Sequence, residues 1–306
     1  MEGNNKRSTP PPPAARKSEP IPSRSGEVSL PDKLSEPDRD IKRYVFLVYG
    51  QEGIGKTTLL SQEPGVLFLT TEPGTRGMRI YENRITSWRQ IKSLVKQLQA
   101  TDRFPCVVLD TVDVAYDLCL DYVCQKLSIP YPGQDESGRE DYGKSWKAVK
   151  KEFMSIVFAL INSGRGVRFI SHYTESEVQA KSGGKYTRIV PSMGKQARLI
   201  LTALADFVFY CEKVRGPNGE VQRVIFTQGD ETIFAKARRT AFGEFPAILP
   251  MPKEGGYDVL VQGFRGKHPG LDPLTLQPAR DTAKSSATFL TRLAHKAAKQ
   301  KHGKGE

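Results

Sequence analysis

Cysteine is rare in this sequence, and neither a long apolar run nor an apolar N-terminal stretch is present. Because no run approaches the ~18 apolar residues of a membrane helix, we expect no transmembrane segment and no membrane partner. Because the N-terminus is polar, we expect no secretory signal. The cysteines show no CxxC spacing, which argues against a disulfide framework or a zinc site and predicts reduced side chains in a cytoplasmic protein. They are Cys106, Cys119, Cys124 and Cys211.

Composition divides the chain into three parts. Residues 1–40 contain "STPPPPAARKSEPIPSRSG" and almost no bulky apolar side chains, so they cannot offset their ordering entropy and are predicted to be disordered. Residues 41–250 carry the apolar periodicity of a folded core. Residues 251–306 are predicted to form an extension broken by Gly and Pro, followed by an Ala/Lys-rich basic tail.

The chain has a formal net charge of +12, and its C-terminus is especially basic. The last 28 residues carry seven Lys and Arg against two Asp and Glu. This balance suits a polyanionic partner such as nucleic acid. A basic tail that only improves solubility is the alternative.

Strand and helix signals alternate through the first part of the core. Apolar strand-like runs at 44–49, 65–70, 106–110 and 167–171 are separated by segments of helical periodicity, among them 87–100 and 145–163. After a helix near 195–204, the runs "DFVFYCEKV", "VQRVIFTQ" and "ETIFAKA" indicate a strand meander. The pattern predicts an α/β fold with a mainly parallel sheet, flanking helices and late antiparallel strands.

A glycine-rich turn follows the first strand in "YVFLVYGQEGIGKTTLL". Glycines allow successive backbone N–H groups to face phosphate oxygens, Lys56 can reach the β- and γ-phosphates, and Thr57 can bind Mg²⁺. A chance match is the alternative, but the strand before and the helix after favour a P-loop. We therefore predict ATP and Mg²⁺ as cofactors, bound by Gly50, Gln51, Glu52, Gly53, Ile54, Gly55, Lys56, Thr57 and Thr58.

Polar residues follow three of the apolar strands: Glu72 after "VLFLT", Asp110 at the end of "CVVLD" and His172 after "RFIS". The carboxyl ends of parallel strands share one edge, where α/β proteins bind ligands. We expect Asp110 to hold Mg²⁺ together with Thr57, and Glu72 to activate the attacking water. The alternatives are a helix cap for Asp110, an exposed turn residue for Glu72 and a packing residue for His172.

The order of these motifs resembles the RecA-like recombinase core. The similarity rests on the P-loop, "FLTTE", "VVLDTVD", a strand that ends in a polar residue before a long loop, and the late "IFAKARRTAFGEF". It covers about residues 42–250. The small size, without a folded extra domain, looks like the core-only RecA-like ATPases of bacteriophages, which are linked to single-strand annealing. A phage origin would place the protein in the bacterial host cytoplasm.

The resemblance implies a role for each motif residue. Lys56, Glu72 and Asp110 would be catalytic, and His172 stands where such cores usually carry a Gln or Asn that senses the γ-phosphate. Lys236 and Arg238 would reach across a subunit interface to a neighbour's nucleotide, which implies a homo-oligomer, either filament or ring. The N-terminal segment shows no clear polymerisation motif.

Two long connections fall where this family binds DNA, and connections of this length are usually functional or mobile. Residues 128–144 are mainly acidic, whereas 173–196 are basic and resemble a hairpin with an "SGG" tip. We favour the second as the single-stranded DNA contact, since cations and aromatic rings grip a single strand. A solvated hairpin is the alternative. The predicted contacts are Lys181, Lys185, Tyr186, Arg188 and Lys195, with Tyr173 also available for stacking.

Together, these patterns predict a DNA-dependent ATPase that promotes annealing or strand exchange, with single-stranded DNA and a single-strand binding protein as candidate partners. A hexameric helicase or packaging motor shares the same core and is the alternative. A small-molecule kinase would need a lid with its own arginines, for which only "TRGMRIYENR" (75–84) is available. A nucleotide-gated DNA binder without hydrolysis is a further possibility.

Overall fold

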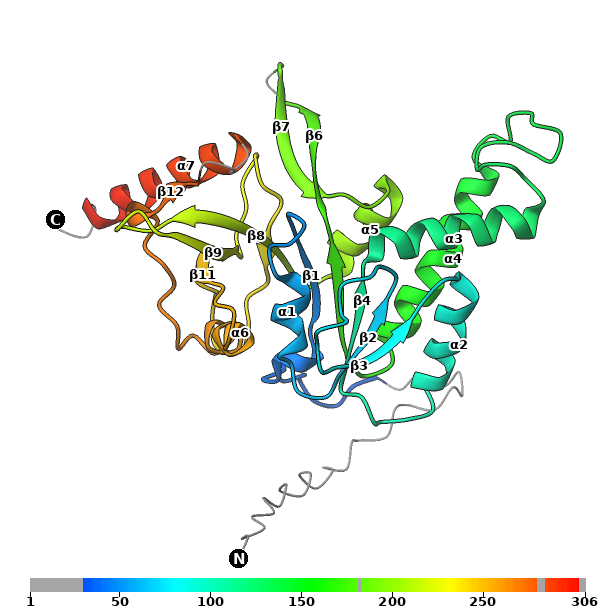
Figure 1. Cartoon of the computed structure of the whole chain (residues 1–306), viewed down its shortest axis with the longest axis horizontal. Helices are drawn as coiled ribbons and strands as arrows, with labels where there is room; N and C mark the ends of the chain where they lie inside the picture. Colours follow the sequence, from blue (N-terminus) through cyan, green and yellow to red (C-terminus); the bar gives the residue numbers. More distant parts are fainter. Residues whose placement is uncertain (1–29, 181–182, 280–283, 303–306) are drawn as a thin grey trace, which may run out of the picture. The chain divides into compact units, whose positions relative to one another are not determined.

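The structure, a computed structural model, describes residues 30–180, 183–279 and 284–302. It is built around one large β-sheet whose central strands are parallel (Figure 1). One compact unit begins at Glu36 and contains all the assigned helices and strands. Most of the predicted disordered segment, 1–29, lies outside the described residues. The parallel strands in spatial order are β3 (Tyr81–Arg84), β2 (Val66–Thr70), β4 (Cys106–Asp110), β5 (Gly166–Ser171), β1 (Val45–Gly50) and β8 (Phe207–Arg215).

Antiparallel strands extend the sheet beyond β8, as the late meander predicts. They are β9 (Val221–Phe226) and β11 (Ile248–Pro250), and two short strands, β10 (Lys236–Ala237) and β12 (Gln277–Pro278), pair with opposite ends of β8. A separate hairpin, β6 (Tyr173–Gln179) and β7 (Lys185–Pro191), leaves the sheet directly after β5. The predicted α/β fold with late antiparallel strands is therefore confirmed.

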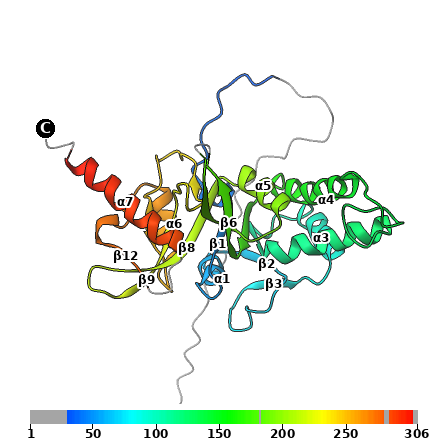
Figure 2. The ribbon, with the colours of Figure 1, turned by 90° about the horizontal axis from the view of Figure 1, so that it is seen from above.

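Helices cover both faces of the sheet. The larger hydrophobic cluster lies under α2 (Trp88–Leu98), α3 (Val112–Leu127), α4 (Lys144–Ile161) and α5 (Lys195–Leu204). The second cluster, on the other face, lies under α1 (Lys56–Ser61) and α6 (Gly256–Phe264). Short 3-10 turns occupy Ile41–Arg43 and Pro273–Thr275. Helix α7 (Lys284–His302) lies beside β8 and β9 (Figure 2), and its Phe289 packs against Phe226 of β9.

The central strands are buried on both faces, which explains why they are continuous apolar runs rather than alternating ones. The helices instead bury one stripe each, and α2 begins with the predicted capping box of Ser87 and Gln90. An ion pair fixes the far end of the P-loop helix: Arg168 on β5 lies 2.9 Å from Glu63, and both side chains are fully buried. Removal of one partner from such a pair costs about 3–5 kcal/mol of stability, so this contact fixes α1 against the sheet.

The structure differs from the sequence prediction in three places. Strand β3 has no apolar pattern because all four residues are exposed on the sheet edge. The late strand predicted at "ETIFAKA" is reduced to two residues, Lys236 and Ala237. The sequence predicts a Gly/Pro-broken extension and a basic tail after residue 250, and in the structure this part forms α6 and α7, whose Leu260, Phe264 and Phe289 enter the two hydrophobic clusters. Within the described residues, no helix has the length and apolar character to cross a membrane.

Candidate nucleotide-binding site

The P-loop leaves β1 at Gly50, where the backbone passes very close to the neighbouring strand. A Cβ on Gly50 would lie 2.3 Å from the carbonyl oxygen of Cys211, so only glycine fits there. Gly55, directly before the lysine, has a φ of +102°, a conformation that residues with side chains rarely adopt. The glycines at the two ends of the motif are thus required by the backbone path of the loop.

Lys56 extends back under the loop that precedes it. Its Nζ donates to the carbonyl oxygens of Gly50 and Gln51, each at 2.9 Å, and the side chain is buried. Burial lowers the pKa of Lys56, and the nearby Cys211 and Asp110 oppose this shift. A buried cation whose hydrogen bonds go to two neutral carbonyls is well placed to accept a phosphate group as its counterion.

Thr57 and Asp110 form the pair expected at a magnesium site. The Thr57 hydroxyl donates to Asp110 Oδ2 at 2.7 Å, and the carboxylate is buried at the end of β4. Burial raises the pKa of Asp110, whereas the Thr57 hydrogen bond and the Lys56 charge lower it. A hydroxyl and a carboxylate oxygen in contact are suitable ligands for Mg²⁺.

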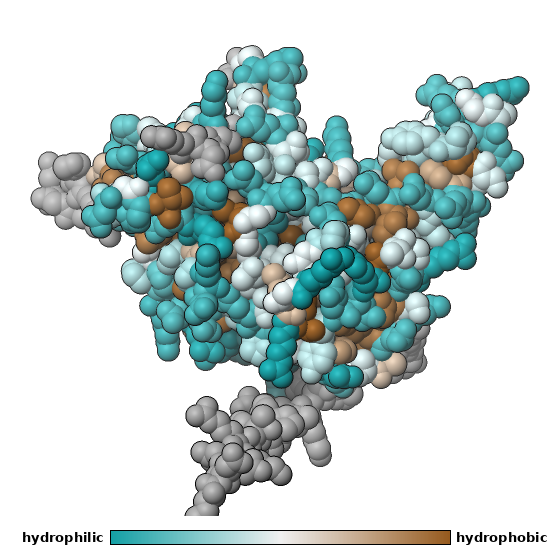
Figure 3. Space-filling model, viewed as in Figure 1, coloured by the Kyte–Doolittle hydropathy of each residue, from teal (hydrophilic) through white to brown (hydrophobic). Residues whose placement is uncertain are grey.

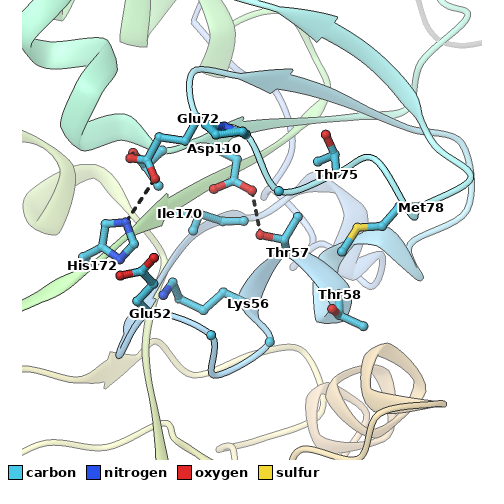
Figure 4. A pocket seen from close by; sticks show the side chains of 15 residues that line it. Glu52, Lys56, Thr57, Thr58, Glu72, Thr75, Met78, Asp110, Ile170 and His172 are labelled. Atoms are coloured by element: carbon cyan, nitrogen blue, oxygen red, sulfur yellow. Dashed lines mark hydrogen bonds and ion pairs between the residues drawn. The ribbon is translucent and has the colours of Figure 1, made fainter.

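Glu72 lies above this pair and is held by two side chains. Thr111 Oγ1 donates to Glu72 Oε1 at 2.6 Å. His172 Nε2 lies 3.3 Å from Glu72 Oε2, the contact that Figure 4 marks with a dashed line. The ends of β2 and β4 are joined as well, since Thr71 N donates to Asp110 O and Thr111 N donates to Thr71 Oγ1. These contacts fix the position of Glu72 while leaving its side chain 37% exposed to the pocket.

The predicted catalytic residues near the P-loop line one cavity of about 290 Å³. The lining includes Lys56, Thr57, Glu72, Asp110 and His172, together with four further P-loop residues, Glu52, Gly53, Gly55 and Thr58 (Figure 4). Gly50, Gln51 and Ile54 lie behind this cavity: the first two position Lys56, and the Ile54 side chain is buried in the second cluster. The donor set therefore fits a nucleoside triphosphate with Mg²⁺.

Sequence reasoning missed residues that support this cavity. Thr111 directly follows Asp110, and its hydroxyl orients Glu72. Asp113 accepts hydrogen bonds from Ser171 Oγ and Ser192 Oγ, and so joins the end of β5 to the end of the hairpin. No local pattern indicates these pairs, because their members are far apart in the sequence.

The remaining predicted catalytic residues, Lys236 and Arg238, lie away from the chain's own cavity. Lys236 pairs with Val208 near the start of β8, whereas the P-loop begins where Gly50 pairs with Cys211. Arg238 Nη1 lies 3.3 Å from Asp206 Oδ1, and its side chain is 57% exposed. Burial and the neighbouring Arg238 lower the pKa of Lys236. Neither residue lines the cavity described above.

The hairpin residues predicted to contact DNA have different environments. Lys185 forms an ion pair with Glu177 at 2.6 Å, and Arg188 lies over Phe234 and donates to Asp230 O. Tyr186 is half-buried and Lys195 is exposed at the start of α5, while Lys181 lies outside the described residues. On the face seen in Figure 3 the projecting hairpin is mainly hydrophilic. Arg188 is therefore engaged with its own chain rather than directed outward.

The sheet order and the cavity together define the class of protein. The P-loop strand β1 and the Asp110 strand β4 flank β5, and residues that end or follow these strands line the cavity. This is a P-loop NTPase-type domain. The chain belongs to the AAA domain family, whose model matches residues 42–239. Membership of this family indicates a nucleotide-binding ATPase, typically one that uses Mg²⁺. A search of curated proteins found no match.

Proposed function

We propose that this protein is a RecA-like ATPase that binds single-stranded DNA and promotes annealing or strand exchange in phage recombination. The observation that carries the proposal is the continuity between the cavity and the hairpin. His172, which contacts Glu72, is followed immediately by Tyr173, the first residue of β6. A change at the γ-phosphate end of the cavity is thereby next to the segment that we expect to touch DNA.

Hydrogen bonds hold both ends of the β6–β7 hairpin next to His172. Ser192 N, after the second hairpin strand, donates to His172 O at 3.0 Å, and Asp113 accepts from the hydroxyls of Ser171 and Ser192. Both ends of the hairpin are thus fixed beside the catalytic residues. This arrangement supports coupling between nucleotide and DNA, and it favours the hairpin over residues 128–144 as the DNA contact.

The residues of the cavity divide the chemistry of hydrolysis among themselves. Lys56 and the loop amides bind the β- and γ-phosphates, and Thr57 and Asp110 would hold Mg²⁺, which when bound neutralises phosphate charge. Glu72 orients and deprotonates the attacking water. His172, in contact with Glu72, is placed to respond to the presence of the γ-phosphate.

The proposal is tested by the ATPase rate of the full chain with and without single-stranded DNA. We expect the DNA to stimulate hydrolysis, and we expect complementary strands to anneal faster in the presence of the protein. Double-stranded DNA at the same nucleotide concentration is the control. An ATPase rate that is the same with and without DNA would contradict the DNA-dependent part of the proposal. Rings in negative-stain images together with unwinding of duplex DNA would favour the motor alternative.

Replacing Lys56 with alanine should weaken ATP binding while the protein stays folded. Hydrogen bonds to charged groups contribute about 1.5–3 kcal/mol each, so we expect the Kd to rise roughly tenfold or more. A titration with a fluorescent ATP analogue measures this. The matched control is Lys150→Ala, which removes an exposed lysine from α4. Unchanged affinity of the Lys56 variant would contradict the assignment of the P-loop.

The basic C-terminal helix α7 should add non-specific DNA affinity. Because Phe289 and Leu290 of α7 are buried, deleting residues 279–306 would disturb the core, and charge removal is the cleaner test. Lys296 and Lys299 are exposed one turn apart. Their double alanine variant should bind single-stranded DNA more weakly and lower the slope of log affinity against log salt by about 1.4, or ~0.7 per lost phosphate contact.

The control for this variant removes two exposed lysines from a different helix. Lys150→Ala/Lys151→Ala on α4 changes the net charge equally, so it separates local contacts from overall charge. Equal salt slopes for wild type and the α7 variant would mean that α7 serves solubility only.

A further inference from the structure

An arginine outside the motif lies against the P-loop. Strand β1 ends where Gly50 pairs with Cys211 of β8, but β8 and β9 continue beyond this point. Arg223 of β9 pairs with Lys213, two residues past the position of Cys211. Because side chains alternate along a strand, Arg223 lies on the same face as Ile225, which belongs to the second hydrophobic cluster with Ile54 of the P-loop. The register alone therefore places this arginine over the loop.

The contacts agree with the register. Arg223 Nη1 donates to Ile54 O at 3.2 Å. A Cβ on Gly55 would lie only 2.6 Å from the same nitrogen, so the absence of a side chain at Gly55 lets the guanidinium reach the loop backbone. Met251 N donates to Arg223 O, and the Met251 methyl lies 3.6 Å from the same Cβ position. The arginine is thus held in place from the β11 side.

Arg223 shares its surroundings with the P-loop lysine. Burial raises the pKa of the Cys211 thiol to about 12, and the charges of Lys56 and Arg223 both oppose that shift. Both cations are therefore close enough to Cys211 to affect its pKa. Arg223 also lines a second cavity of about 330 Å³, together with Gln222, Pro250 and Met251, so it is open to a ligand.

We infer that Arg223 is a second phosphate-binding cation of this site, supplied by the same chain from β9. In the sheet, β8 and β9 lie on one side of β1, whereas Asp110 and Glu72 follow strands on the other. Arg223 therefore approaches the P-loop backbone from the side opposite the magnesium pair. A guanidinium can hold phosphate oxygens with two parallel hydrogen bonds, and its bond to Ile54 O is a single contact to a neutral acceptor. The inference rests on the proposed nucleotide binding.

The test compares two substitutions of Arg223 in the full chain. Arg223→Gln removes the charge but keeps an amide that can donate to Ile54 O. If Arg223 only supports the P-loop backbone, this variant should therefore keep that function. Arg223→Lys keeps the charge without the planar fork. Binding of a fluorescent ADP analogue is measured at several salt concentrations, and melting temperatures report folding. The control is Arg215→Ala, an equal loss of charge at an arginine that donates to Gly219 O in the β8–β9 turn.

We expect Arg223→Gln to raise the Kd for ADP roughly tenfold or more and to reduce its salt dependence, since a charged hydrogen bond is lost. Arg223→Lys should fall between this variant and wild type, and Arg215→Ala should bind as wild type does. ADP affinity and salt dependence of Arg223→Gln within twofold of wild type would overturn the inference. Lys56→Ala distinguishes failure of the proposed nucleotide site from failure of the role of Arg223. If Lys56→Ala also binds ADP as wild type does, the loop does not bind the nucleotide. If Lys56→Ala weakens ADP binding and Arg223→Gln does not, only the role of Arg223 is wrong.

Discussion

Replacing Glu72 with glutamine should leave ATP binding intact and slow hydrolysis by at least about 100-fold, the usual contribution of a general base. Glutamine has nearly the same shape and can still accept the hydrogen bond from Thr111 Oγ1, which holds Glu72 at 2.6 Å. What it loses is the ability to take a proton from the attacking water. The measurement is the single-turnover hydrolysis rate at saturating ATP, beside the Kd for a fluorescent ATP analogue.

The control for Glu72 is Glu136→Gln, an equal change at an exposed acid of the loop 128–144. Its hydrolysis rate should match that of wild type. If Glu72→Gln hydrolyses ATP nearly as fast as wild type, the base lies elsewhere, and Asp113 is the next carboxylate to test. The structure makes Asp113 a weaker choice, because its Oδ1 already accepts from Ser171 and Ser192 and it does not line the cavity.

The fold and the centre of the site could be predicted from local sequence patterns. Strands buried on both faces are continuous apolar runs, and the turn residues of the P-loop are fixed by the backbone path at Gly50 and Gly55. Glu72, Asp110 and His172 follow strands, so the parallel sheet alone brings them to one edge. In each case the signal is contained in a few consecutive residues.

What could not be predicted depends on pairs that are distant in the sequence. Arg223 reaches the P-loop only because β9 runs past the end of β1, a consequence of strand register. Thr111 supports Glu72 across two strand ends, and Phe289 of α7 completes a cluster begun more than two hundred residues earlier. The sequence also does not show that Arg188, a predicted DNA contact, packs over Phe234 and donates to the Asp230 carbonyl.

Lys236 and Arg238 do not line the cavity of their own chain. Lys236 pairs with Val208, near the start of β8. Arg238 is mostly exposed, and its ion pair with Asp206 is of the kind that contributes about 0–1 kcal/mol. Ala237 between them packs against the second hydrophobic cluster, as the alternation of a strand requires. If these cations act on a nucleotide, they act on that of a neighbouring subunit.

The double variant Lys236→Ala/Arg238→Ala should therefore bind ATP normally but lose hydrolysis by about 10³-fold or more, the scale on which arginine fingers contribute. The matched control is Arg265→Ala/Lys267→Ala, which removes two exposed cations at the same spacing. It should hydrolyse ATP as wild type does. A double variant with a wild-type rate would mean that the two cations only protect an exposed sheet edge.

Mixing two inactive variants decides whether the cations act between subunits. A Lys56→Ala subunit has lost its own P-loop lysine but still carries Lys236 and Arg238, so it can complete the site of a double-variant neighbour whose P-loop is intact. Hydrolysis should reappear in the mixture and reach its maximum at intermediate ratios, although neither parent is active alone. Crosslinking or light scattering must show that the two variants assemble together. If they do and no ratio restores activity, the two cations do not complete a neighbour's site, and the resemblance to oligomeric recombinases loses its strongest mechanistic support.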